Sequence, residues 1–221
     1  MASPRKSGIL PFQRLRTLVR QGAICADVPI AQEQIQPASL DLRLGTKAYR
    51  LLSSFLPEPS DQQAQFTIED LYRSDLVMYD MDLSEGAILE KGHVYLVPLM
   101  ERLKLPKDVR GRTNPKSSTG RLDIFTRVVT DLHVGFDEVR AGYQGPLFLE
   151  IVPRSCTIRV HAGLALNLLL LMSGKPLVSD TSLRAVHRKT PLLCHNGEDG
   201  ATDRPLPVKD LRVDNGLFLR V

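Results

Sequence analysis

Hydrophobic residues follow a helical period near the N-terminus. Phe12, Leu15, Leu18 and Val19 share one face of a helix over residues 11–20, because residues three and four apart lie on the same side of an α-helix. We therefore predict a short amphipathic helix at the start of the chain. It is the clearest helical pattern in the sequence.

From about residue 35 the pattern becomes that of strands. Leu40, Leu42 and Leu44 alternate with polar residues, which is typical of a half-buried strand, and Gly45 follows as a stop. Short apolar runs then recur between turn residues, at 87–89, 94–98, 147–152, 157–160 and 164–172. A parallel α/β fold would need helices between these strands, and few are indicated. The pattern favours a mainly β sandwich or barrel.

The pattern changes again after Met172. Residues 173–176 are small and polar, 196–200 read as a loop, and 208–221 offer a further strand that stops at the end of the chain. We expect a first domain over 1–175. Residues 176–221 are expected to form a polar linker and the start of a second, truncated domain.

Composition indicates an ordinary globular protein. Of the 221 residues, 24% are charged and 43% hydrophobic, and the net charge is +4, which suits an anionic small ligand as well as a nucleic acid. The basic residues are dispersed and Trp is absent, so we expect no nucleic-acid face. The longest apolar run, 164–172, contains Asn167 and falls short of the about 20 residues that span a bilayer. We expect no membrane segment.

Cysteines and histidines exclude two other classes of protein. Cys25, Cys156 and Cys194 are odd in number and widely spaced, which does not indicate a disulfide framework and predicts a reducing, cytoplasmic location. The five histidines show no paired ligand spacing, and the zinc-deaminase signature is absent. A zinc site is not expected.

One stretch carries the candidate chemistry. Residues 114–122, Asn-Pro-Lys-Ser-Ser-Thr-Gly-Arg-Leu, offer hydroxyls and two cations that can surround phosphate oxygens, and Glu150 lies on a later strand. If that strand turns Glu150 inward, its carboxylate could move a proton for attack by water. From the residues alone, a solvated turn and an exposed strand glutamate are the commoner interpretations of this pattern.

Four motifs in order resemble the metal-independent dCTP deaminases of the trimeric dUTPase-like superfamily. They lie at 36–45, 116–122, 142–145 and 149–150, and the chain looks most like the N-terminal part of the long bacterial members. The resemblance implies a distorted β-barrel of the β-clip type with an N-terminal helix and few short helices. It also implies deamination of dCTP to dUTP and ammonia, which feeds dUMP and dTTP synthesis.

The resemblance also implies roles for particular residues. Glu150 matches the general acid and base, Ser117 the hydroxyl that positions the attacking water, and Arg121 the arginine that organises the site. The remaining residues are expected to bind the substrate: Lys116, Ser118, Thr119 and Gly120 in the triphosphate loop, with Phe148, Leu149 and Arg140. The family binds Mg²⁺ through the triphosphate, uses no zinc and places its active sites between the subunits of a homotrimer.

The chain departs from the family pattern at three positions. Lys116 stands where an arginine is usual, Arg140 stands at the position of an aspartate that contacts the sugar, and Leu168 replaces a glutamine. Two alternatives therefore stay open. One is a non-catalytic nucleotide-binding or trimer-forming module that needs a missing C-terminal domain. The other, which Arg140 disfavours, is a dUTP pyrophosphatase.

Overall fold

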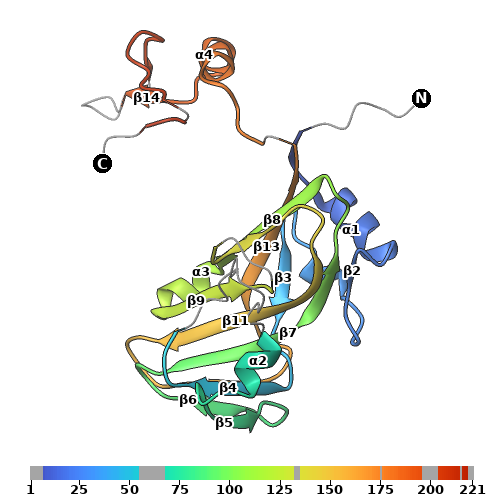
Figure 1. The fold of residues 1–221 in the computed structure, drawn as a ribbon. Helices are drawn as coiled ribbons and strands as arrows, with labels where there is room; N and C mark the ends of the chain where they lie inside the picture. The colour runs from blue at the N-terminus through green and yellow to red at the C-terminus, as the bar shows by residue number, and fades with distance from the viewer. Residues whose placement is uncertain are drawn as a thin grey trace, which may run out of the picture. The chain divides into compact units, whose positions relative to one another are not determined.

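A computed structural model describes residues 7–54, 68–131, 135–174, 176–195, 204–214 and 216–218 (Figure 1). The chain divides into two compact units, Met1–Gly174 and Lys175–Val221. The loop predicted at 196–200 lies outside the described residues. The interpretation of the second unit as the start of a truncated domain stays a prediction.

The first unit consists mainly of strands. Its helices are α1 (Phe12–Arg20), the 3₁₀ helix η1 (Gln32–Gln34), α2 (Ile68–Tyr72) and α3 (Ser117–Arg121). Its strands are β1 (Gly8–Ile9), β2 (Ile24–Cys25), β3 (Leu40–Arg43), β4 (Lys47–Leu51), β5 (Val77–Asp82), β6 (Ala87–Leu89), β7 (Val94–Lys104), β8 (Val109–Pro115), β9 (Ile124–Val129), β10 (Glu138–Val139), β11 (Gln144–Pro153), β12 (Ile158–Val160) and β13 (Ala165–Ser173).

Two antiparallel sheets contain most of these strands. One has the order β1-β13-β8-β10 with β3 also paired to β13, and the other has the order β5-β4-β7-β11-β9 with β2 also paired to β7. The predicted mainly β fold is confirmed, as are the N-terminal helix and the strands expected from the apolar runs. In the described part of the chain, the sheets stay open and do not close into a barrel.

Alternation along β11 gives the second sheet two different faces. Leu147, Leu149 and Ile151 enter the main core, which also receives Leu15 and Leu18 from α1. Phe148 instead joins a smaller apolar cluster with Leu51, Leu96 and Val129, to which α2 adds Ile68 and Leu71. The outer face of this sheet is therefore partly covered by α2, and the side chain of residue 150 belongs to the same outer face.

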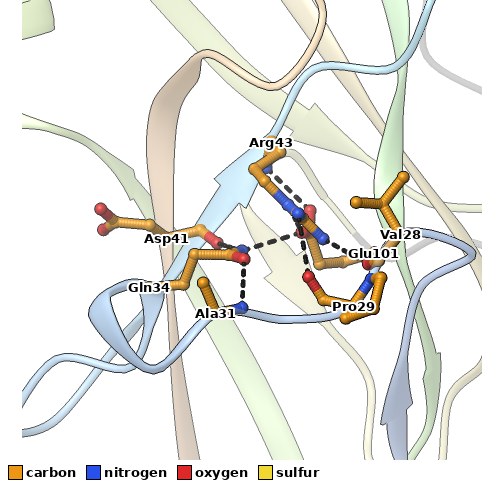
Figure 2. Close-up of polar contacts among 7 residues, drawn as sticks. All are labelled: Val28, Pro29, Ala31, Gln34, Asp41, Arg43 and Glu101. Atoms are coloured by element: carbon orange, nitrogen blue, oxygen red, sulfur yellow. Dashed lines mark hydrogen bonds and ion pairs between the residues drawn. The ribbon is translucent and has the colours of Figure 1, made fainter.

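A buried ion pair fixes the loop before β3 (Figure 2). Glu101 is fully buried, and its carboxylate accepts hydrogen bonds from Arg43 Nε at 2.8 Å, the Arg43 backbone N–H at 2.7 Å and Gln34 Nε2 at 3.0 Å. Arg43 also donates to the carbonyls of Val28 and Pro29. The pair thus joins β3, β7 and the 28–34 segment.

The second unit contains a helix that the sequence patterns did not indicate. Helix α4 (Asp180–Lys189) begins after Ser179, whose hydroxyl accepts a hydrogen bond from the Ser182 N–H, and β14 (Cys194–His195) pairs with β15 (Arg204–Pro205). The strand predicted over 208–221 is wrong in its described part. Arg184 donates hydrogen bonds to the carbonyls of Val208 and Leu211. Beyond them, one isolated β-bridge joins Val213 and Leu217.

Candidate active site

Glu150 lies near the middle of β11 and is buried, with 1% of its surface exposed. Its Oε1 accepts a hydrogen bond from Arg127 Nε at 2.7 Å, and its Oε2 accepts one from the Ser54 hydroxyl at 2.7 Å. Glu150 is therefore not the exposed strand residue that the pattern also allowed, but it is buried on the outer face of the sheet and, in the described part of the chain, forms no hydrogen bond with the 116–122 loop. Both oxygens are bound by side chains, and each keeps a lone pair that could accept a proton or a further hydrogen bond.

Arg127 reaches Glu150 because the two residues are direct partners in the β9–β11 register. The Arg127 guanidinium also donates to the Ser54 hydroxyl, and it lies 3.6 Å from the centre of the Phe136 ring and 5.1 Å from that of Phe125. Neither Arg127 nor Ser54 was predicted from the sequence, since only the strand register places Arg127 opposite Glu150 and only the folded chain brings Ser54 to it.

A second acid lies beside this cluster. Asp137 has a left-handed backbone with φ of 61°, and its Oδ1 accepts hydrogen bonds from the Thr113 hydroxyl at 2.7 Å and the Val128 N–H at 2.8 Å. Burial raises the pKa of the Asp137 carboxyl, while these two hydrogen bonds and the nearby Arg127 oppose the rise. Asp137 was also missed, because it resembles an ordinary loop residue in the sequence.

The predicted phosphate loop is a short helix, α3, rather than an irregular turn. Ser117, Ser118 and Arg121 are exposed, and within the described residues their side chains form no hydrogen bond or ion pair. Helix α3 has no side-chain cap at its N-terminus, so the first N–H groups have no partner in the helix. The exposed face of α3 thus presents hydroxyls and a guanidinium to solvent.

Other residues of the predicted loop are bound within the chain. Lys116 forms an ion pair with Asp41 on β3, and the buried Thr119 hydroxyl donates to the Leu166 carbonyl at 2.8 Å. The Thr119 side chain therefore anchors α3 to β13. A phosphate contact from Thr119 would have to come from its backbone N–H, whereas the Gly120 N–H already donates to the Lys116 carbonyl at 3.0 Å.

The other predicted substrate-binding residues have different environments. Arg140 is exposed. Phe148 lies in the smaller apolar cluster on the outer face of the sheet. The Leu149 side chain lies in the main core, on the opposite face of the sheet from Glu150. Any contact between Leu149 and a nucleotide would come from its backbone.

The 142–145 motif has a local structural explanation. Gly142 has φ of 71°, a conformation that favours glycine. A Cβ at Gly145 would lie 2.7 Å from the Tyr143 hydroxyl, which donates to the Pro146 carbonyl at 2.6 Å. Burial raises the pKa of Tyr143 to about 12, so this phenol stays protonated at neutral pH.

The structure thus brings Glu150 together with Arg127 and Ser54, but not with the predicted partners on α3. Among the described residues, no hydrogen bond joins Glu150 to Ser117 or Arg121. Glu150 and the exposed face of α3 are thus two separate candidate half-sites in the described chain. The first offers a carboxylate that can take up a proton, and the second offers donors for an anion.

Neither a metal-ligand cluster nor a membrane-spanning helix is present in the part of the chain that the structure describes. The described residues include no group of three or more His, Cys, Asp or Glu side chains that could hold a metal ion. In the same residues, no helix combines the length and the apolar character needed to cross a bilayer. Cys25, Cys156 and Cys194 are free thiols.

Solved structures and curated proteins resemble this chain over most of its length. The crystal structure of 2'-deoxycytidine 5'-triphosphate deaminase from Agrobacterium tumefaciens matches with a TM-score of 0.77 and 45% sequence identity, over 84% of this chain and 54% of that chain. This chain therefore matches about half the length of that protein.

Two curated relatives are more distant in sequence. A dUMP-forming dCTP deaminase of Methanosphaera stadtmanae is 30% identical over 145 residues, which are 65% of this chain and 67% of that protein. A dCTP deaminase of Ignicoccus hospitalis is 24% identical over 202 residues, or 91% of this chain and 99% of that protein. Residues 6–175 also match the family model of the 2'-deoxycytidine 5'-triphosphate deaminase N-terminal domain. The chain belongs to the dCTP deaminase family.

Proposed function

We propose that this protein deaminates dCTP hydrolytically to dUTP and ammonia. The observation that carries the proposal is the buried Glu150 carboxylate, which is held by Arg127 and Ser54 on a strand of the family domain. A carboxylate in this position can accept the proton of a water molecule that attacks C4 of cytosine. It can then return that proton to the departing ammonia.

The exposed face of α3 is proposed to complete the site. Ser117 would position the water, Arg121 would organise the base and its charged intermediate, and Ser118 with the α3 backbone would bind the triphosphate. Hydroxyls, N–H groups and a guanidinium suit phosphate oxygens. Lys116 is already paired with Asp41, so we assign it a smaller share of phosphate binding than Arg121.

We propose that Mg²⁺ is bound by the phosphate oxygens of the substrate and not by side chains of α3. The exposed α3 residues are hydroxyls and an arginine, which bind phosphate and supply no carboxylate to a cation. The triphosphate oxygens would therefore hold Mg²⁺, which neutralises part of their charge when bound. We propose no zinc in the reaction.

We further propose that the two half-sites meet between the subunits of a homotrimer. Glu150 and Arg121 have no contact within the described chain, and Ser117, Ser118 and Arg121 have no polar partner there. A neighbouring subunit would bring α3 to Glu150. The free cysteines fit a reducing cytoplasm, which we propose as the location.

The relatives leave open whether the product is dUTP or dUMP, since some are dUMP-forming and others are named only as deaminases. We favour dUTP, because exposed Arg140 stands where an aspartate would be needed to hold a water for pyrophosphate hydrolysis. Product analysis after incubation with dCTP separates the outcomes, since dUMP formation also releases pyrophosphate.

The test compares the wild-type protein with Glu150→Gln. We expect a loss of ammonia release on the order of 10²–10⁴-fold, the usual contribution of general acid–base catalysis, with dCTP binding retained in calorimetry. Glu138→Gln removes an exposed carboxylate of β10 and should leave the rate unchanged. Full activity in Glu150→Gln would exclude the proposed role of this residue.

The second candidate function is a nucleotide-binding or trimer-forming module without turnover. It is favoured by the match to only 54% of the Agrobacterium chain. Nucleotide binding without ammonia release, and activity only in a longer chain that includes downstream sequence, would support this candidate over the enzyme.

A further inference from the structure

Arg127 is the cation that contacts the Glu150 carboxylate, and no other cation in the described residues forms an ion pair with it. We propose that Arg127 is a positioning residue, which keeps Glu150 ionised and in one orientation. The proposal rests on the proposed function, in which Glu150 must accept a proton from water at the start of the reaction.

The surroundings of Glu150 make a cation necessary. Its cross-strand neighbour on β7 is Leu96, and Phe148 lies two residues away on the same face. Both side chains belong to the outer apolar cluster. A carboxylate buried among apolar groups strongly favours its protonated form unless an opposite charge or hydrogen-bond donors compensate. Arg127 supplies the charge.

Ser54 closes a ring with the two charged groups. The Arg127 guanidinium donates to the Ser54 oxygen, and the Ser54 hydroxyl donates to Glu150 Oε2 at 2.7 Å, while Arg127 Nε donates to Oε1 at 2.7 Å. The bond from Arg127 sets the direction of the Ser54 hydroxyl. The carboxylate is consequently held at both oxygens, which fixes its plane.

Phe136 holds the arginine in turn. The guanidinium carbon lies 3.6 Å from the centre of the Phe136 ring, and 23% of the Arg127 side chain is exposed. A planar guanidinium can stack on a ring and donate in two directions at once, which the ammonium of a lysine cannot reproduce. Arg127 is thereby limited to one orientation against Glu150.

Arg127 takes no part in the proton transfers themselves. Ionised Glu150 takes a proton as the oxygen of water bonds to C4, and it gives the proton to the amino nitrogen as the C4–N bond breaks. Arg127 stays protonated throughout. Its removal should therefore lower turnover by reducing the ionised fraction of Glu150, and a higher pH should partly restore the rate.

The first measurement does not depend on activity. Protein with ¹³C-labelled glutamate is titrated by NMR, and the Glu150 carboxyl signal is assigned from its absence in Glu150→Gln. In Arg127→Met we expect the Glu150 carboxyl to keep its proton to a higher pH than in the wild type, because the opposite charge that favours the carboxylate is gone. Titration at the same pH in both proteins would overturn the proposal, whether or not the protein deaminates dCTP.

Kinetics provide the second measurement. For Arg127→Met we expect kcat for ammonia release to fall about 10²-fold at pH 7. KM should stay within about threefold of the wild-type value, and the acid limb of the pH–rate profile should move to higher pH. Arg127→Lys restores the positive charge but not the planar pair of donors of the guanidinium. The acid limb of its pH–rate profile should therefore return towards that of the wild type, while kcat stays reduced.

Arg112→Met is the matched control, because Arg112 forms an exposed ion pair with Glu138 on the same domain. It should leave both the titration and the kinetics unchanged. A loss in Arg127→Met that lies wholly in KM would instead make Arg127 a substrate-binding residue and overturn the proposal. If wild-type protein releases no ammonia, the proposed function fails, and the NMR titration still decides the role of Arg127.

Discussion

Two buried glutamates in this domain show how similar residues acquire different roles. Glu101 is bound by Gln34, by Arg43 and by the Arg43 backbone, and all of these partners belong to the framework around β3. Glu150 is bound by exposed Ser54 and partly exposed Arg127. Solvent can therefore approach the partners of Glu150 more easily than those of Glu101. This difference in partners fits a structural role for Glu101 and the proposed proton-transfer role for Glu150.

Asp137 provides a prediction at the residue scale. Burial raises its pKa above the ordinary value of 3.8, so the folded protein keeps this proton at a pH where the unfolded chain has lost it. The resulting contribution to stability is fully present below about pH 3.8 and is lost as the pH rises through the folded pKa. Relative to Asp137→Asn, the wild type should lose stability as the pH rises above about 4.

Asparagine is a conservative probe at this position. It tolerates the left-handed backbone at 137, and its amide oxygen can still accept from Thr113 and Val128. Thermal melts of both proteins as a function of pH test the expectation. A stability difference that stays constant with pH would show that the Asp137 proton is bound equally in the folded and unfolded chains.

At the scale of elements, the sequence predicts strands better than their pairing. Alternation at Leu40, Leu42 and Leu44 places β3 directly, because the period of two depends only on local geometry. The register between β9 and β11 depends on the whole sheet, so the pairing of Arg127 with Glu150 was not predictable. The Lys116–Asp41 ion pair joins β3 to the start of α3 and was missed for the same reason.

The Arg43–Glu101 pair gives a prediction for the elements it joins. Arg43→Met leaves a fully buried carboxylate without its cation, which should cost about 3–5 kcal/mol of unfolding free energy. The double variant Arg43→Met/Glu101→Gln removes the unpaired charge and should be more stable than Arg43→Met alone. Urea denaturation of both variants provides the comparison.

The control for this pair is again Arg112→Met, whose partner Glu138 is exposed. Loss of such a surface pair should cost less than about 1 kcal/mol. If the double variant were less stable than Arg43→Met, the hydrogen bonds to Glu101, rather than the compensation of its charge, would dominate the energy of this cluster.

At the scale of the whole molecule, the ordered motifs predicted the family and the mainly β fold, but not the helix of the second unit. Helix α4 was missed because its residues are largely polar and little of it is buried: His187 is its one buried side chain among those described. The predicted site residues Ser117 and Arg121 do not contact Glu150 in the described chain, and the motifs did not indicate this separation because they give only the order of residues along the chain.

The proposed trimer makes a prediction about two inactive variants. Glu150→Gln and Arg121→Met each remove one half-site, so each alone should be inactive. If every site takes Glu150 from one subunit and Arg121 from its neighbour, any mixed cyclic trimer contains one intact site, or about a third of wild-type activity. Co-expression with two affinity tags and purification through both tags isolates the mixed trimers for an ammonia-release assay. Inactive mixed trimers would place Glu150 and Arg121 of each site in the same subunit.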